Sequence, residues 1–292
     1  MSSQPRNTRK NTRIWPKLGL GTGTLASLGR ASSLAEVEKL IGVMLGAGIT
    51  LIDTADSYGS GDCEILLGKA MRVRRQEFSV VTKAGYRLSN LPGSFRPLNQ
   101  FIKKAKQRIG CKSCHEPDYL VRCLEDSLRR LRTDHVDAFL LHDPPLEAIS
   151  QAVIGACEGM RKSGKALLTG ISSDNPAVLH AAISSGAFDV IQTPASLEVA
   201  AEMRPIWEAC KSAGIHVIAN HVFAPGCLTH PEMNHETLMR ASAALLPSTA
   251  TILCGTRNPS HLIEATRWAT DPLPEAEAMR LAELMTQRQP HG

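Results

Sequence analysis

Residues 138–171 read AFLLHDPPLEAISQAVIGACEGMRKSGKALLTGI, and this stretch decides the fold class. It holds a short apolar run at Ala138–His142, a helical pattern over 149–163, and a second apolar run at Leu168–Ile171. Short apolar runs that end in small or polar residues are typical of strands buried on both faces. Two such runs joined by a helix form a βα unit with parallel strands. The stretch therefore predicts an α/β protein built on a parallel sheet.

The same unit recurs eight times along the chain. We predict strands at Leu18–Gly21, Thr50–Asp53, Ser79–Thr82, Ala138–His142, Leu168–Ile171, Val190–Thr193, His216–Ala219 and Ala250–Cys254. We predict helices near 33–46, 63–72, 117–131, 149–163, 176–185, 203–213, 235–246 and 259–269, four of which end near Gly46, Gly164, Gly186 and Gly214. Eight units without a linker favour a single-domain (β/α)8 TIM barrel over an open doubly wound sheet, because GLGTGT at 19–24 does not complete a G-x-G-x-x-G phosphate turn.

The charge is unevenly distributed. The chain has 292 residues and a formal net charge of +5, and residues 1–16 and 84–115 together carry eleven basic side chains and no acidic ones. The rest of the chain is therefore mildly acidic, which argues against nucleic acid as a partner. We expect 1–16 to be a basic, disordered tail and 17–292 to be the barrel. The long basic insertion at 84–115, between the third strand and its helix, is expected either to steer an anionic cofactor or substrate towards the barrel mouth or to be a solvated variable loop.

The chain shows no targeting or membrane signal. No apolar run reaches the roughly 18 residues of a spanning helix, and the polar start lacks the apolar core of a secretory signal. We therefore expect a cytoplasmic protein with no membrane partner. The eight cysteines lie mostly in apolar segments and are expected to be reduced and buried. Cys111–His115, CKSCH, matches a haem-attachment pattern, but we interpret it as a chance match and predict no metal site.

Polar, titratable residues end three consecutive strands. Asp53 ends the second predicted strand, Lys83 follows the third and His142 ends the fourth, while Tyr58 lies on the loop after Asp53. In a (β/α)8 barrel the chemistry lies at the carboxyl ends of the strands. We therefore expect these four side chains to meet at one mouth.

These four side chain types suit a proton relay. A phenol with a pKa near 10 is a poor acid or base at pH 7, and a neighbouring ammonium such as Lys83 lowers that pKa. Asp53 supplies the counter-ion that a partly buried lysine needs, and His142 could donate to a substrate oxygen. Such a relay fits conversion of a carbonyl into an alcohol. No nucleophile or metal set is evident, so the reductant would have to be a cofactor.

Several motifs carry a family resemblance. They are Leu20-Gly21-Thr22-Gly23, Asp53-Thr54-Ala55-Asp56-Ser57-Tyr58-Gly59, Thr82-Lys83, Ser127-Leu128-Arg129-Arg130-Leu131, His142-Asp143-Pro144, Gly170-Ile171-Ser172, Gln192 and Gly255-Thr256-Arg257-Asn258-Pro259. With these motifs the chain resembles the aldo-keto reductase family over about residues 18–269. The resemblance implies that Tyr58 is the general acid/base, that Lys83 lowers its pKa, that Asp53 pairs with Lys83, and that His142 orients the carbonyl.

The resemblance also implies a nicotinamide cofactor, NADP, with NAD as the alternative, and a small aldehyde, ketone or sugar-like alcohol as substrate. The positions implied to bind the cofactor are Gly21, Thr22, Ser172, Ser173, Gln192, Asn220, His221, Gly255, Thr256, Arg257, Asn258, His261 and Glu264. The chain departs from the family pattern at Ser173, where asparagine is usual, and at Ala265, again in place of asparagine. His221 would have to replace an aromatic residue that stacks on the nicotinamide.

Two alternative functions stay open at this point. Because of those departures, the chain could be a nucleotide-binding sensor or regulatory subunit with little turnover. A metal-dependent barrel hydrolase is the third hypothesis, but it lacks a convincing ligand set.

Overall fold

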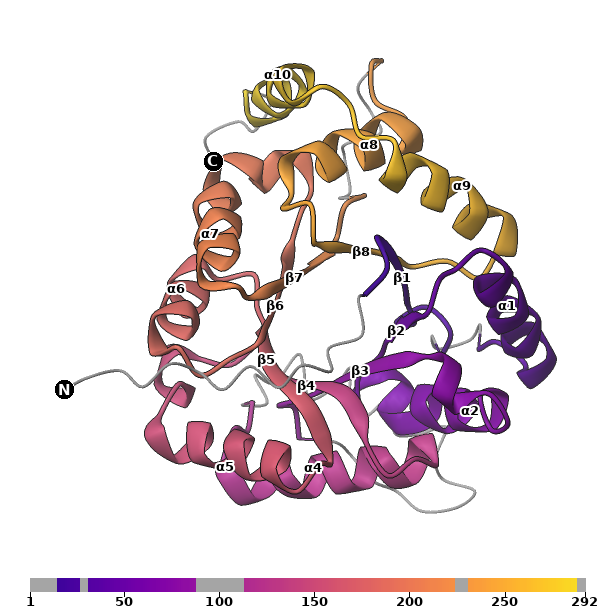
Figure 1. The fold of residues 1–292 in the computed structure, drawn as a ribbon, viewed down its shortest axis with the longest axis vertical. Coiled ribbons are helices and arrows are strands. Elements are labelled where there is room, and N and C mark those ends of the chain that lie inside the picture. The colour runs from indigo at the N-terminus through magenta and orange to yellow at the C-terminus, as the bar shows by residue number, and fades with distance from the viewer. Residues whose placement is uncertain (1–14, 27–30, 88–112, 224–230, 288–292) are drawn as a thin grey trace.

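A computed structural model describes residues 15–26, 31–87, 113–223 and 231–287. Eight parallel strands form a closed barrel in chain order, seen end-on in Figure 1. The strands are β1 (Leu18–Gly21), β2 (Leu51–Asp53), β3 (Ser79–Ala84), β4 (Val136–His142), β5 (Ala166–Ser172), β6 (Val190–Pro194), β7 (His216–Asn220) and β8 (Thr251–Cys254). The predicted (β/α)8 fold is confirmed, and every strand lies within two residues of its predicted position.

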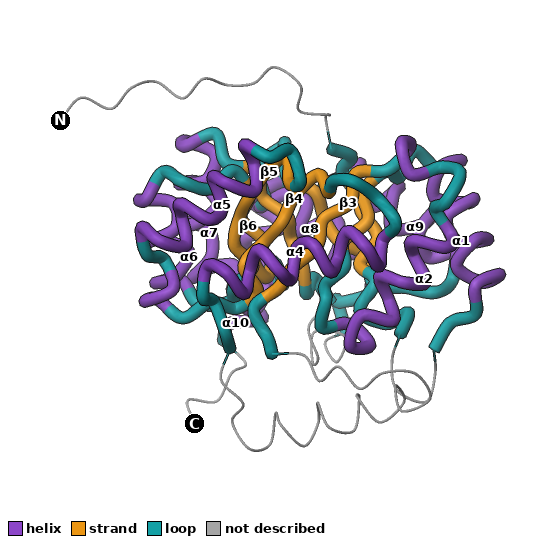
Figure 2. The backbone as a smooth tube through the Cα atoms, turned by 90° about the horizontal axis from the view of Figure 1, so that it is seen from below, coloured by secondary structure: helices purple, strands orange, loops and turns teal. Residues whose placement is uncertain are grey.

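Helices surround the barrel, as the end-on view in Figure 1 shows, and Figure 2 shows the strands behind the helices from the side. They are α1 (Leu34–Gly46), α2 (Asp62–Ala70), α4 (Pro117–Leu131), α5 (Gln151–Lys162), α6 (Pro176–Ser185), α7 (Ala200–Ala213), α8 (His235–Leu245), α9 (Pro259–Thr270) and α10 (Glu275–Thr286). Side chains cap several of them in the expected way. For example, Ser33 and Glu36 form a reciprocal capping box at the start of α1.

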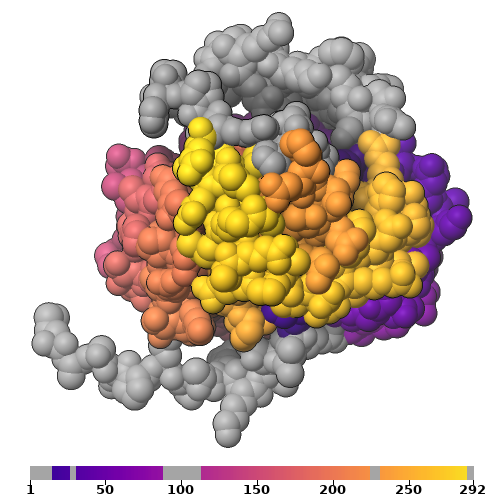
Figure 3. Space-filling model, turned by 90° about the horizontal axis from the view of Figure 1, so that it is seen from above, coloured from indigo at the N-terminus to yellow at the C-terminus, as the bar shows by residue number. Residues whose placement is uncertain are grey.

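Two expectations about the helices are corrected. Gly46 is not the C-cap of α1: it is the last residue of the helix, which ends where predicted, and the C-cap is Ala47. The predicted helices end at 269, but a further helix, α10, follows at Glu275–Thr286 and packs on α7 and α8. Figure 3 shows α10, in yellow, lying beside the orange surface of α8. The apolar residues of α10 alternate with charged ones at helical spacing, so the pattern was visible in the sequence.

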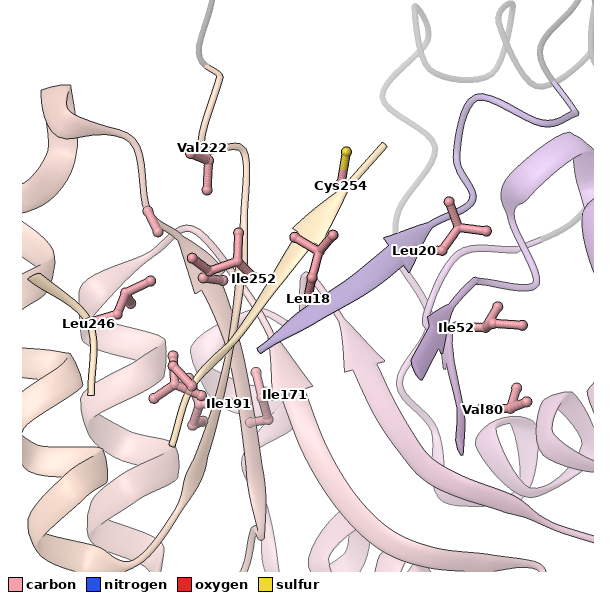
Figure 4. Packing of buried hydrophobic residues seen from close by; sticks show 14 of the residues in the cluster. Leu18, Leu20, Ile52, Val80, Ile171, Ile191, Val222, Leu246, Ile252 and Cys254 are labelled. Atoms are coloured by element: carbon pink, nitrogen blue, oxygen red, sulfur yellow. The ribbon is translucent and has the colours of Figure 1, made fainter. Parts of the chain in front are cut away.

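The strands divide the apolar residues between two layers. Side chains that point outward, such as Leu20, Ile52 and Ile171, pack under the helices and form the main core, part of which is drawn in Figure 4. Side chains that point inward form a second, smaller cluster that fills the barrel. It consists of Leu51, Val81, Ala138, Leu140, Val190, Ile218 and Leu253, with Trp15 and Leu168 packed against it.

This interior cluster fixes which residues can reach the mouth of the barrel. Successive side chains on a strand point to opposite faces, so the residue two positions beyond an inward apolar residue also points inward. Asp53 follows Leu51 in this way, and Lys83 follows Val81. The residues at the corresponding positions of the eight strands are Gly21, Asp53, Lys83, His142, Ser172, Gln192, Asn220 and Gly255. All eight are among the residues singled out from the sequence.

Trp15 lies at the opposite end of the barrel. It packs on the interior cluster, and its ring meets the ring of His216 edge-on at a centroid distance of 4.7 Å. Nε2 of His216 lies 3.1 Å from Oγ1 of Thr251, which itself donates to the carbonyl of Pro16. Since the Thr251 proton is committed to Pro16, Nε2 of His216 carries the hydrogen and donates. The segment just before β1 therefore covers the amino-terminal end of the barrel.

Some expectations fall on residues outside this description. The predicted tail at 1–16 is described only from Trp15, and the insertion at 84–115 only at its two ends. Six cysteines lie in the described part of the chain, and all six are free and buried: Cys63, Cys114, Cys123, Cys157, Cys210 and Cys254. None of the helices described has the length and apolar character needed to cross a membrane.

His216 makes the stability of the fold depend on pH. Burial, with a smaller effect from the charge of Lys17, lowers the pKa of His216 from 6.5 to about 4. Between pH 6.5 and 4 the unfolded chain therefore binds a proton at His216 that the folded chain does not bind. The free energy of unfolding consequently falls as the pH falls through this window. We expect a loss of about 3 kcal/mol in the free energy of unfolding, measured by urea denaturation at several pH values.

His216→Gln keeps a donor for Thr251 without titrating and should lose most of this pH dependence. His180→Gln, at an exposed position on α6, serves as the matched control and should behave like the wild type. An unchanged pH dependence in His216→Gln would contradict the assignment.

Candidate active site

The four predicted catalytic side chains gather at the carboxyl ends of β2, β3 and β4. Asp53, Lys83 and His142 point into the barrel from the three strands, and Tyr58 begins the short 3₁₀ helix Tyr58–Gly61 that follows β2. The rings of Tyr58 and His142 meet edge-on at a centroid distance of 6.2 Å. The Nζ atom of Lys83 lies 5.3 Å from the centroid of the Tyr58 ring. The expected juxtaposition is therefore present.

The turn after β2 depends on glycine. Gly59 adopts φ +60°, and a Cβ atom built on it would lie 2.6 Å from Cβ of Ala26. Any larger residue would both strain the backbone and push the turn away from the loop that follows β1. The Tyr58-Gly59 pair thus sets how closely Tyr58 approaches the mouth.

Lys83 and Asp53 form a buried ion pair. Nζ of Lys83 donates to both carboxylate oxygens of Asp53, at 2.7 Å to Oδ1 and 2.6 Å to Oδ2. Nε2 of Gln192 donates to Oδ1 of Asp53 at 2.8 Å, and Oγ of Ser172 donates to Oε1 of Gln192 at 2.7 Å. A chain of hydrogen bonds therefore runs from β5 through β6 to β2 and β3. Burial removes the Asp53 carboxylate from water, and these hydrogen bonds satisfy its lone pairs.

The Lys83–Asp53 pair keeps its charges in spite of burial. Burial alone would lower the pKa of Lys83, but the charge and the hydrogen bonds of Asp53 outweigh it, so the net pKa is raised. Lys83 is only 1% exposed. It therefore remains an ammonium group across the neutral range, which is the state that an electrostatic role requires.

The pKa of Tyr58 differs from the expectation. The positive charge of Lys83 is the largest single influence and lowers it, as expected. Burial of the hydroxyl and the negative charge of Asp53 act in the opposite direction, and together they leave the pKa of Tyr58 raised. The expected net lowering is thus wrong, because burial of the hydroxyl, with a smaller contribution from the charge of Asp53, outweighs the effect of Lys83 on the pKa of Tyr58. Tyr58 is a neutral phenol with a proton to donate.

A second buried carboxylate lies behind the site, and we did not predict it from the sequence. Glu64 on α2 is fully buried and accepts from Oγ1 of Thr82 at 2.6 Å and from Nε of Arg130 at 2.6 Å. Arg130 belongs to a motif already noted, and Thr82 immediately precedes Lys83. The network ties α2 and α4 to β3 and so supports the strand that carries Lys83.

The residues implied to hold the carboxamide end of a cofactor lie together across the mouth. Ser172, Ser173 and Gln192 are buried at the ends of β5 and β6. Asn220 ends β7, and its Oδ1 atom is buried and has no partner within the described part of the chain. Since a buried polar atom without a partner costs free energy, this oxygen is suited to accept from a bound group.

Two further residues implied to bind the cofactor make contacts within the protein. Both the amide and Oγ1 of Thr22 donate to the carbonyl of Asp53, so its side chain braces β1 against β2. His221 is exposed with φ +52°, and its Nδ1 lies 3.9 Å from a carboxylate oxygen of Asp174. Gly21, at the end of β1, lies beside Gly255, whose added Cβ atom would lie 3.9 Å from the Gly21 carbonyl.

The turn after β8 gathers the remaining implied residues. Oγ1 of Thr256 accepts from the amide of Asn258 at 3.0 Å and lies 3.3 Å from Nδ1 of His261, while Asn258 caps α9. Arg257 is half-buried in this turn, and its charge reaches Glu36 on α1. Glu264 lies exposed one turn into α9. The turn offers one guanidinium and a helix N-terminus, a combination that suits a phosphate.

Other residues close to His142 also escaped prediction. Tyr86 packs against the His142 ring, and its hydroxyl donates to Asp143. His115 lies 3.2 Å from the carbonyl oxygen of His142. Within the described residues, no group of three or more His, Cys, Asp or Glu side chains is placed to hold a metal ion.

Comparison with known proteins agrees with this geometry. The sequence profile of the Aldo/keto reductase family matches residues 17–276. The chain therefore belongs to the aldo/keto reductase family, a family of oxidoreductases, and the resemblance inferred from its motifs is confirmed.

Individual relatives are distant. A D-threo-aldose 1-dehydrogenase from Pseudomonas sp is 29% identical over 245 residues, which cover 74% of this chain and 68% of that protein. The aldo-keto reductase yakc of Schizosaccharomyces pombe, named with NADP(+), is 25% identical over 219 residues, or 73% of this chain. The match spans only 60% of the length of that protein.

Solved structures share the fold. The aldo-keto reductase AKR11C1 from Bacillus halodurans, in a holo form, superimposes with a TM-score of 0.70 at 21% identity, covering 92% of this chain and 91% of that one. An aldo/keto reductase from Klebsiella pneumoniae in complex with NADP and acetate gives a TM-score of 0.66 at 20% identity, covering 95% and 94% of the two chains. At these identities the likeness shows the barrel alone.

The buried pair yields a prediction about stability. Asp53→Asn leaves the Lys83 ammonium buried without its counter-ion, and we expect a loss of about 3–5 kcal/mol in the free energy of unfolding. Burial then lowers the pKa of Lys83 below its unfolded value. The folded variant therefore binds fewer protons than the unfolded chain, and its stability should rise with pH from about 7 to 10, measured by urea denaturation.

The wild type should show no such rise in that range, because its Lys83 pKa is raised and its stability declines only above the unfolded value. The double variant Asp53→Asn/Lys83→Met removes both charges and should recover part of the loss. A double variant no more stable than Asp53→Asn would argue against the pair.

Proposed function

We propose that the chain is an NADP(H)-dependent oxidoreductase that interconverts a small carbonyl compound and its alcohol, with Tyr58 as the general acid/base. The observation that carries this proposal is the buried Lys83–Asp53 pair lying under the face of Tyr58, with His142 beside the same ring. Aldehydes, ketones and sugar-like compounds form the substrate class. One relative is named as a sugar dehydrogenase, which supports the last of these.

The proton chemistry follows from the charges. Reduction of a carbonyl places negative charge on its oxygen, and a neutral phenol at that oxygen can donate its proton. Lys83 then stabilises the phenolate that remains, because its ammonium lies close to the ring. His142, on the neighbouring strand, would orient the carbonyl oxygen. A nicotinamide cofactor, when bound, supplies the hydride that completes the reduction.

The residues present fit such a cofactor. Buried polar side chains at the ends of β5 and β6 and the unpartnered oxygen of Asn220 suit an amide group, while Arg257 and the N-terminus of α9 suit a phosphate. The names of the S. pombe relative and of the K. pneumoniae structure include NADP, which supports NADP over NAD.

The proposal is tested with Tyr58→Phe. Removing the proton donor while keeping the ring should lower kcat by about 10²–10⁴-fold, the usual contribution of a general acid. Turnover is measured by loss of NADPH absorbance over a panel of aldehydes, ketones and aldoses. Titration of NADPH fluorescence is the control and should give the same Kd for variant and wild type.

Undiminished turnover of a confirmed substrate by Tyr58→Phe would refute the role of Tyr58. The same measurements address the sensor alternative, which predicts tight nucleotide binding without turnover on any member of the panel. The tetrad at the mouth favours the enzyme.

Preference between the two cofactors should depend on Arg257. Arg257→Ala removes the guanidinium nearest the α9 N-terminus, so the Kd for NADPH should rise about tenfold while the Kd for NADH changes little. Both constants are measured by fluorescence titration. Arg267→Ala, at an exposed position on α9 itself, is the matched control. Equal weakening of both cofactors would argue against recognition of the 2′-phosphate by Arg257.

A further inference from the structure

The two described ends of the insertion are joined to each other and to α4. Tyr86 and Ser113 form an antiparallel bridge, and the amide of Cys114 donates to the carbonyl of Gly85 at 2.7 Å. The hydroxyl of Tyr119 on α4 donates to the carbonyl of Tyr86 at 2.9 Å. We call Gly85, Tyr86, Ser113, Cys114 and His115 the insertion base. This base is a built part of the barrel mouth, next to Lys83.

The insertion base holds the backbone of His142. Nε2 of His115 lies 3.2 Å from the carbonyl oxygen of His142. Since a carbonyl only accepts, Nε2 carries the hydrogen and donates, which leaves Nδ1 of His115 unprotonated. That Nδ1 atom is buried and has no partner in the described part of the chain. His142 is the last residue of β4, so its carbonyl lies where the strand pairing of the sheet ends, and His115 is the hydrogen-bond partner at that position.

Glycine at position 85 makes this contact possible. A Cβ atom built on Gly85 would lie 2.4 Å from Nε2 of His115 and 2.6 Å from the carbonyl oxygen of His142. Gly85 also adopts φ +156°, which side chains disfavour. The backbone of residue 85 is thus packed directly against the hydrogen bond between the two histidines.

The insertion base also contacts the His142 ring. The ring of Tyr86 meets the His142 ring edge-on at a centroid distance of 4.9 Å, in addition to the edge-on contact between His142 and Tyr58. The Tyr86 hydroxyl donates to Oδ2 of Asp143 at 2.6 Å, and the amide of Asp143 donates to the carbonyl of Ser172 at 2.8 Å. Asp143 adopts φ +46°, a turn that directs its carboxylate back to Tyr86. Tyr86 is thereby fixed against the ring.

We propose that His115 and Tyr86 are positioning residues for His142, His115 through its backbone carbonyl and Tyr86 through its ring. This proposal rests on the proposed function, in which His142 orients the substrate carbonyl. It also gives a role to His115, the last residue of the Cys111–His115 motif, that involves neither haem nor metal. The insertion is thus coupled to catalysis through its two ends.

The test uses four variants and two readouts. His115→Leu removes the donor, and Tyr86→Leu removes the ring contact. Each should lower kcat/KM for the carbonyl substrate about tenfold to a hundredfold, the effect of a displacement of about 1 Å, with the Kd for NADPH unchanged. Tyr86→Phe keeps the ring contact and should lose much less than Tyr86→Leu. His180→Leu, at an exposed position, is the matched control.

The second readout needs no turnover. In the full chain labelled at histidine, the ring resonances of His142, assigned with His142→Gln, should shift in His115→Leu and Tyr86→Leu but not in His180→Leu. A merely structural role would lower the melting temperature and leave both the resonances and kcat/KM as in the control. That result would overturn the proposal.

If His115→Leu does not fold, His115→Gln and His115→Asn replace it. The glutamine amide reaches the position of Nε2 and should restore kcat/KM, whereas the shorter asparagine should not. Equal values for the two would count against His115. Failure of the proposed function is recognised separately, because wild-type protein would then show no turnover while the His142 resonances still report whether the ring is positioned.

Discussion

The buried ion pair between Lys83 and Asp53 is the interaction on which the site depends. An ammonium that is 1% exposed is tolerated only with a carboxylate in direct contact, and that carboxylate needs further donors of its own. Gln192 supplies one, and Ser172 holds Gln192 in place. Four strands therefore contribute to the charge state of one lysine. Because the strands must be in register for these contacts to form, the electrostatics of the mouth and the closure of the barrel depend on each other.

The barrel achieves this register through simple alternation. Inward apolar residues such as Leu51, Val81 and Leu140 fill the interior, and the next inward position on each strand lies at the mouth, where polar groups can reach a ligand. A shift of one residue in the register of a strand would turn its polar side chain towards the helices and its outward apolar side chain towards the mouth of the barrel. The packing of the apolar interior therefore determines which side chains lie at the mouth of the barrel.

The same alternation explains what the sequence could predict. Strand positions and the identities of Asp53, Lys83 and His142 follow from short apolar runs and the polar residues that end them. Contacts between segments far apart in the chain leave no such local signal. His115 reaches the carbonyl of His142, and Glu64 reaches Arg130, only because the fold brings them together. The net shift in the pKa of Tyr58 could not be predicted from the sequence either, because it depends on burial and on the opposing charges of Lys83 and Asp53.

The opposing effects of Lys83 and Asp53 on the pKa of Tyr58 bear on which direction of the reaction the site favours. A lysine without a counter-ion would lower the pKa of Tyr58 and favour a phenolate, which can accept a proton from an alcohol. Here Asp53 accepts two hydrogen bonds from Lys83, and burial of the Tyr58 hydroxyl together with the charge of Asp53 leaves the pKa of Tyr58 raised. In the proposed function, Tyr58 therefore holds the proton that reduction of a carbonyl would consume. In the proposed function, Lys83 would act most strongly after that proton has left, when its ammonium faces a phenolate, and such differential stabilisation lowers a barrier.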